Sequence, residues 1–155
     1  MTTLAIKLSA DELSAVMRFD LMTFLHRCFI KLNPNSELSE APHLRVLAAK
    51  LADCLLGLGP KRLIISLPPR SLKSITVSVA AVAWLMGQDP TKQIICASYG
   101  QELADKHARD TRTVMMSSFY RELFPGTRLS PRRCPSTTSQ QQRMNFGWQP
   151  QSVAY

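Results

Sequence analysis

The hydrophobic pattern changes its period after Pro60, and this change constrains the fold more than any other feature of the sequence. Residues 62–67 form a short β-branched run bounded by prolines, which is typical of a buried strand. Residues 73–86 are apolar nearly all round and predict an interior helix. A second strand-like run covers 93–98, and helical spacing returns over 101–118. This order predicts an α/β fold whose parallel sheet is connected by right-handed helical crossovers.

Two helices are expected before the change of period. Ser9 and Glu12 have the spacing of a capping box, and one apolar stripe then continues to Leu32. A further amphipathic pattern predicts a helix over 41–56, with Pro42 in its first turn. Two helices therefore precede the predicted sheet.

Composition bounds the class of protein. The 155 residues are one domain's worth, and 45% hydrophobic with 19% charged residues is a globular composition. The formal charge of +8 permits a polyanionic partner but does not identify one. The four cysteines include no CxxC pair, which argues against a structural zinc site. No signal peptide or membrane span is predicted, so we expect a soluble, cytoplasmic protein without a membrane partner.

The stretch from Arg62 to Ser74 has the arrangement that a phosphate-binding loop needs. A buried strand leads into a tight loop, and Lys73 and Ser74 open a helix. Backbone N–H groups at such a helix start hold phosphate, the lysine neutralises it, and the hydroxyl binds Mg²⁺. The match to G-x-x-x-x-G-K-[ST] is incomplete, because Leu67 and Leu72 occupy the glycine positions. The motif alone leaves phosphate binding and a structural Pro-rich turn equally open.

The chain resembles the start of the ATPase domain of phage terminase large subunits, the motors that package viral DNA. The resemblance extends over roughly 42–129 and rests on several motifs in order. They are the loop Pro68-Pro69-Arg70-Ser71-Leu72-Lys73-Ser74, the run Ile94-Ile95-Cys96-Ala97-Ser98-Tyr99, the residues Leu103-Ala104, Arg109-Asp110 and Arg112, and the run Tyr120-Arg121-Glu122-Leu123-Phe124-Pro125.

The resemblance implies ATP and Mg²⁺ as cofactors, and double-stranded viral DNA, a small terminase subunit and a portal as partners. Lys73 would contact the β- and γ-phosphates, Ser74 the Mg²⁺, and Arg70 the γ-phosphate. The implied nucleotide-binding residues are Pro69, Arg70, Ser71, Leu72, Lys73 and Ser74. Tyr99 would line the nucleotide or DNA face, or pack half-buried. The implied location is the cytoplasm of a bacterial host that carries a prophage.

Leu72 replaces the glycine that usually lets the backbone approach phosphate. We expect Leu72 to keep a negative φ and to turn its side chain away from the concave side of the loop. A phosphate site could then survive the substitution.

The sequence lacks the acidic residues that hydrolysis and DNA cleavage need. No acid follows a strand-like run after the loop, and the acidic cluster of the family's nuclease is absent. We therefore expect no turnover by this chain alone. Residues 145–155 stand where the family has a stretch that precedes its acidic strand, so we interpret the chain as a truncated, frameshifted remnant.

The predicted organisation is a helical segment over 1–40, a partial P-loop ATPase domain over 41–125, and a basic tail over 126–155 that we expect to be disordered. Two alternatives stay open. One is a fragment of another P-loop NTPase of helicase type. The other is a non-catalytic module that binds nucleic acid through the arginines of the tail, which are Arg128, Arg132, Arg133 and Arg143.

Overall fold

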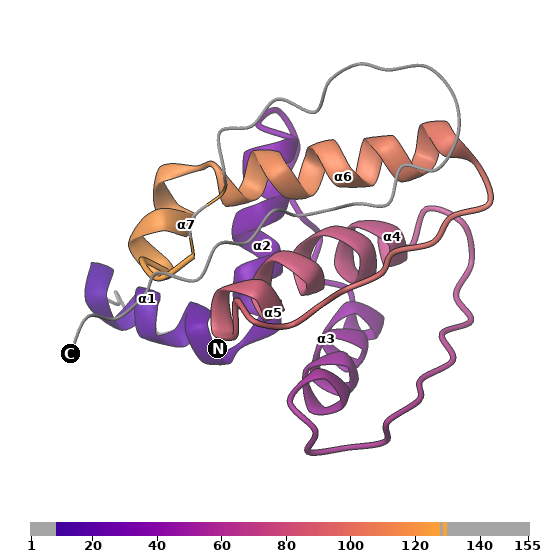
Figure 1. Ribbon diagram of the computed structural model, residues 1–155, viewed down its shortest axis with the longest axis horizontal. Helices are drawn as coiled ribbons and strands as arrows, with labels where there is room; N and C mark the ends of the chain where they lie inside the picture. The colour runs from indigo at the N-terminus through magenta and orange to yellow at the C-terminus, as the bar shows by residue number, and fades with distance from the viewer. Residues whose placement is uncertain (1–8, 128, 130–155) are drawn as a thin grey trace, which may run out of the picture.

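The computed structural model describes residues 9–127 and 129, and its regular elements there are helices (Figure 1). The tail predicted to be disordered falls on Arg128 and residues 130–155, which lie outside this part of the chain. The elements are α1 (Ala10–Phe19), α2 (Leu21–Leu32), α3 (Pro42–Leu55), α4 (Lys73–Ile75), the π-helix η1 (Thr76–Ala80), α5 (Ala81–Gln88), α6 (Gln101–Met115) and α7 (Ser118–Leu123).

The N-terminal helix begins as predicted but ends earlier. The capping box is confirmed, because Ser9 Oγ accepts from the Glu12 N–H at 3.3 Å and Glu12 accepts from the Ser9 N–H at 2.8 Å. The prediction of a single helix up to Leu32 is wrong, because the helix is interrupted at Asp20. The Asp20 carboxylate accepts from the N–H groups of Met22 and Thr23 and thereby starts α2 as an N-cap.

The interior helix combines three labelled elements in one continuous run from Lys73 to Gln88. Its first turn is α-helical, and the wider π-turn of η1 follows before α5 resumes the α-helical geometry. Both α5 and η1 lie between other helices, with α6 along one side and α2 behind (Figure 1). The prediction of an interior helix here is confirmed.

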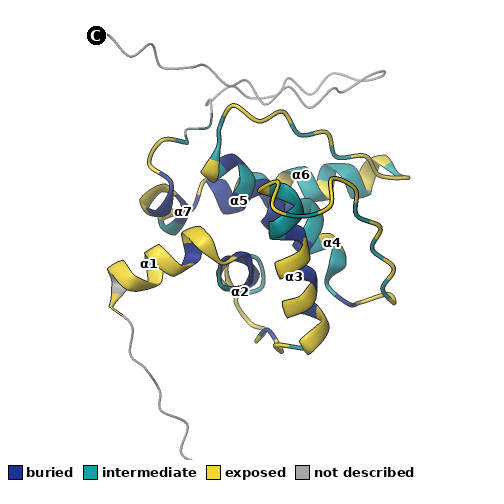
Figure 2. Cartoon of the chain, turned by 90° about the horizontal axis from the view of Figure 1, so that it is seen from below, coloured by how far each residue is buried: buried dark blue, intermediate teal, exposed yellow. Residues whose placement is uncertain are grey.

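The core is built where α2, α3, α6 and α7 face this interior helix. Buried residues colour most of α5 and the inward sides of α2 and α3, whereas the outer sides of α1 and α3 are exposed (Figure 2). Trp84 and Tyr120 are fully buried and use their polar atoms internally. Trp84 Nε1 donates to the Met17 carbonyl at 3.2 Å, and the Tyr120 hydroxyl donates to the Ala83 carbonyl at 2.8 Å. The first two helices therefore share one core with the rest of the described chain.

The expected parallel sheet is wrong for the described residues, because neither strand-like run belongs to a sheet. The runs are nevertheless strand-like in their burial. Leu63, Ile65 and Leu67 are half-buried, whereas Ile64 between them is 96% exposed. In the second run Ile94 and Cys96 are half-buried and Ile95 is 94% exposed.

Whether such a run becomes a strand depends on a neighbouring strand with which its backbone can pair. The alternation of apolar side chains requires only that one side of the chain lies on the helices, as Leu63 and Ile94 do. A parallel sheet also requires backbone pairing on its edges and cover on both faces. Two parallel strands by themselves would have unpaired backbone on both edges and incomplete cover on their faces. Two-stranded sheets are accordingly marginal in water. The predicted strands at 62–67 and 93–98 are therefore wrong, although the alternation of burial along both runs is real.

Among residues 9–127, no helix has both the length and the apolar character that a membrane span requires.

Candidate phosphate-binding loop

The loop between the first extended run and the interior helix has an unusual backbone. Arg70 and Leu72 adopt positive φ angles of 62° and 59°. Leu72 has ψ 12°, so it is in the left-handed helical region, and the residue after it begins α4. A left-handed residue followed by a right-handed one turns successive N–H groups toward one side, and this geometry favours anions. The carbonyl of Leu72 accepts from the N–H and the hydroxyl of Thr76, which anchors the turn to the helix.

The negative φ expected for Leu72 is therefore wrong. Its backbone has the conformation that the motif's glycine would adopt, at a cost that glycine would not incur. The cost is tolerated because the side chain packs against the hydrophobic core, in a wall shared with Phe29, Leu38 and Leu44. A branched side chain thus stands at a glycine position because the helices behind the loop have room for it.

Lys73 is half-buried and its ammonium group folds back over the loop. Its Nζ donates to the carbonyl oxygen of Leu67 at 2.9 Å. Leu67 and Leu72 are the two residues that replace the motif's glycines, so Lys73 closes the loop between its two ends. A lysine at a helix N-terminus is disfavoured by the helix dipole, and the carbonyl contact offsets part of that cost.

The other predicted loop residues divide into exposed and buried. Pro69, Arg70 and Ser74 are exposed. Ser71 is buried, 9% exposed, and its Oγ has no hydrogen-bond partner among the described residues. The sequence places all of these residues in one loop, but it gives no signal that Ser71 points inward, because serine is common on either side of a turn.

Tyr99 does not pack half-buried. Its side chain is 99% exposed, after the second extended run and just before α6. Its expected place on a nucleotide or DNA face stays a prediction.

Three of the described acids after the loop, Asp89, Asp105 and Asp110, make local contacts. Asp89 accepts from the hydroxyl of Thr91 at 2.5 Å and from its N–H at 3.0 Å, and these bonds hold the pKa of this carboxyl below its usual value. Asp105 accepts from Gln101, and Asp110 forms an ion pair with Lys106 at 2.6 Å. Within the described chain, no three His, Cys, Asp or Glu side chains gather as metal ligands would.

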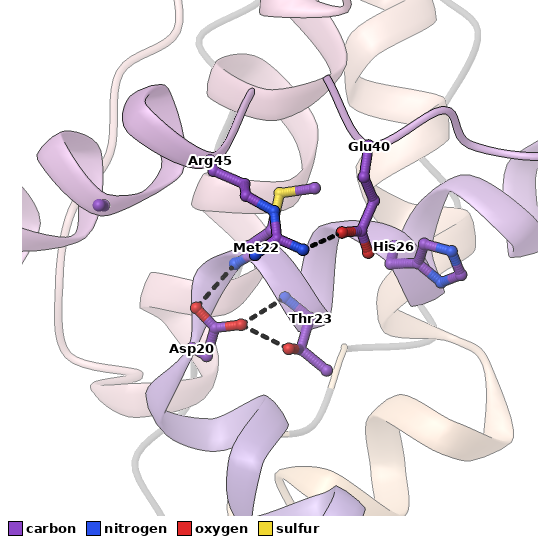
Figure 3. A pocket seen from close by; sticks show the side chains of 7 residues that line it. Asp20, Met22, Thr23, His26, Glu40 and Arg45 are labelled. Carbon is purple, nitrogen blue, oxygen red and sulfur yellow. Dashed lines mark hydrogen bonds and ion pairs between the residues drawn. The ribbon is translucent and has the colours of Figure 1, made fainter. Parts of the chain in front are cut away.

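A separate polar cavity of about 330 Å³ is lined by residues at the start of α2 and by residues of α3 and the segment before it (Figure 3). Its charged groups are already engaged. Asp20 caps α2, and Arg45 forms an ion pair with Glu40, as the dashed lines show (Figure 3). His26 and Met22 complete the lining. Each of these contacts is local to the start of one helix, Asp20 at α2 and the Arg45–Glu40 pair at α3, so we assign them a structural role.

Comparison with known proteins adds no relative. No family model, curated protein or solved structure matches the chain.

Proposed function

We propose that this chain is the nucleotide-binding part of a DNA-packaging ATPase of the terminase large-subunit type. The observation that carries the proposal is the loop that ends at Lys73. Its ammonium group lies over the loop on the Leu67 carbonyl, and two left-handed residues bend the backbone before the helix begins. A cation and converging N–H groups at one helix start are what the phosphates of ATP require.

Each loop residue has a role in this proposal. Lys73 exchanges the Leu67 carbonyl for the β- and γ-phosphate oxygens, which are stronger acceptors because they are charged. Arg70 is exposed in the same loop and would contact the γ-phosphate. Pro69, Ser71 and Leu72 fix the backbone that presents the N–H groups. The phosphates gain charge-assisted hydrogen bonds, and the protein gives up one neutral acceptor.

Mg²⁺ enters the proposal with the nucleotide. Ser74 is exposed beside Lys73 and offers one hydroxyl oxygen to the ion. The chain's own donors near the loop are too few for a metal site, so phosphate oxygens and water would supply the remaining ligands. No group of acids in the described chain gathers as metal ligands would, and we therefore expect ATP binding without appreciable hydrolysis. Duplex DNA, a small terminase subunit and a portal remain the proposed partners of the motor.

Titration calorimetry with ATP, in the presence and absence of Mg²⁺, tests the proposal. We expect binding that is strengthened by Mg²⁺ and lost in Lys73→Ala. Lys61→Ala is the matched control, because Lys61 is an exposed lysine on the other side of the extended run. It removes the same charge and should leave the affinity unchanged.

Binding that ignores Mg²⁺ and survives Lys73→Ala would refute the phosphate loop. The two alternatives give other results. A helicase-type NTPase would show the same binding but would be followed by helicase motifs in an intact gene. A basic nucleic-acid-binding module would bind DNA without any nucleotide, through arginines that lie outside the described residues.

A further inference from the structure

The extended run over 61–67 lies at the margin of the molecule, on the connection from α3 to α4 (Figure 1 and Figure 2). Leu63 packs against the core, and Ile65 is half-buried as well. Ile64 between them is 96% exposed. One face of the run therefore rests on the helices, and the other face is open to another chain.

The backbone of this run is also open. The N–H groups of residues 61–67 make no hydrogen bond to any described residue, and among their carbonyl groups only that of Leu67 accepts one, from Lys73. An extended segment with unpaired N–H and C=O groups is a template for strand pairing. The run thus lacks a neighbouring strand within the described chain, and a strand from another molecule would supply it.

We propose that this run pairs with the same run of a second copy of the chain, antiparallel and centred on Ile64. The inference is independent of nucleotide binding. A two-fold axis through the centre places residues equally distant from Ile64 opposite one another. The opposed pairs are Lys61 with the partner's Leu67, Arg62 with the partner's Ser66, Leu63 with the partner's Ile65, and Ile64 with the partner's Ile64.

The sequence ends symmetrically about this centre. Pro60 and Pro68 each lie four residues from Ile64, so each proline stands opposite the other and the ladder stops at both ends. With the two Ile64 residues as a non-hydrogen-bonded pair, the prolines also occupy non-hydrogen-bonded pairs, where a missing N–H costs no ladder bond. A run bounded in this way is complete when it pairs with itself.

The side chains of the outward face favour Ile64 as the centre. The two isoleucines meet directly across the axis, and Arg62 meets a hydroxyl, so no like charges are opposed. A pair centred on Arg62 would oppose two guanidinium groups. A pair centred on Ser66 would oppose Arg62 to Arg70. Of the three outward residues, Ile64 is therefore the one about which a second copy fits without repulsion.

Sedimentation velocity of the full chain over a range of concentrations tests the proposal. A single strand pair is a small interface, so we expect a weak dimer that dissociates on dilution. Ile64→Lys should weaken this dimer roughly tenfold, because two ammonium groups then face each other across the axis. Ile95→Lys is the matched control, since Ile95 is 94% exposed on the second extended run, outside the proposed pair. Both variants should melt like the unsubstituted monomer.

Substitutions of Ser66 test the register. Ser66→Glu places a carboxylate opposite the partner's Arg62 twice in each dimer and should tighten it roughly two- to tenfold at low salt. High salt should remove most of this gain, because exposed ion pairs are screened. Ser66→Lys should weaken the dimer by a similar factor. Ala97→Glu makes the same change of net charge at an exposed position of the second run, and it should leave the affinity unchanged.

The outcomes distinguish this pairing from other contacts. A chain that stays monomeric up to millimolar concentration would overturn the second copy as the occupant and leave the run to a different polypeptide. Equal weakening by Ile64→Lys and Ile95→Lys would overturn the assignment to this run. A dimer that is lost in Ile64→Lys but tightens equally in Ser66→Glu and Ala97→Glu would overturn the register, because net charge alone would then explain the gain.

Discussion

The ring of Phe124 lies directly against the backbone of Gly87. A β-carbon added to Gly87 would stand 2.4 Å from Cδ2 of Phe124, and the ring itself is buried among the aromatic side chains of α2 and α7. The end of α5 can approach α7 only because residue 87 has no side chain. Glycine inside a helix is ordinarily a cost, and here close packing of the two helices explains it.

Gly87→Ala should therefore destabilise the protein, although alanine is the better helix former. The methyl group would force the Phe124 ring or the end of α5 to move, at about 1–3 kcal/mol of unfolding free energy. Chemical denaturation measures the loss. Gly100→Ala is the control, because a β-carbon there meets no atom within 4 Å. Equal stability of the two variants would contradict the packing described for α5 and α7.

Leu72 gives a second prediction, in which a glycine variant is more stable than an alanine variant, the reverse of the usual order. Both replacements remove the leucine side chain and its packing, but only glycine adopts φ 59° without strain. Leu72→Gly should therefore be more stable than Leu72→Ala by about 1 kcal/mol, and both less stable than the unsubstituted chain. Thermal melts of the three proteins test this. An alanine variant as stable as the glycine variant would mean that the left-handed conformation is not maintained.

Tyr120 gives a prediction about alkaline pH. Burial raises the pKa of its hydroxyl above the ordinary value of 10.0. The unfolded chain then loses this proton at lower pH than the folded chain, so stability is full below pH 10 and falls as the pH rises above it. Tyr120→Phe should reduce this fall, and at neutral pH should cost about 1 kcal/mol for the hydrogen bond to Ala83. Denaturation at pH 8 to 11 is the measurement, and an identical pH profile in both proteins would refute it.

The exposed isoleucines of the extended runs give a prediction about self-association. Ile64 and Ile95 are 96% and 94% exposed, on segments whose backbone is unpaired by any strand of the described chain. Such segments are templates for pairing with another chain. The double variant Ile64→Lys, Ile95→Lys should stay monomeric at concentrations where the parent associates, with an unchanged melting temperature. Light scattering reports the first quantity and calorimetry the second. An equally associated variant would exclude these runs as the contact.

The sequence predicted the helices best where a local signal marked an end. The capping box of Ser9 and Glu12 and the proline at the start of α3 both act within one turn, so they can be recognised without tertiary information. The break at Asp20 was missed because the apolar stripe continues across it. An aspartate can either cap the start of a helix or face solvent in the middle of one. The packing of α2 against α1 determines which of the two Asp20 does.

The sequence predicted where the loop lies along the chain but not its backbone conformation. The order of loop, lysine and helix could be recognised in the sequence, and the structure has the helix start at Lys73. The left-handed Leu72 could not be predicted, because leucine rarely adopts that conformation and does so here only with core packing behind it. The prediction of a sheet was wrong because it needs information from more than one segment. Alternating burial is a property of one segment, whereas a sheet is a property of several.

The π-turn of η1 sets the direction in which the loop faces. A π-turn holds one residue more than the α-helical turn it replaces. Thr76, Val79 and Ala80 fill that turn and are fully buried, so the helix beyond it is fixed to the core. Removing a single residue from 76–80 would restore an α-helix and rotate everything before it by about 100°, the angle per residue. Lys73 and Ser74 would then keep their sequence and their helix but face another side of the molecule. The direction that the candidate phosphate-binding loop faces is thus set by one residue of helix length rather than by any residue of the loop.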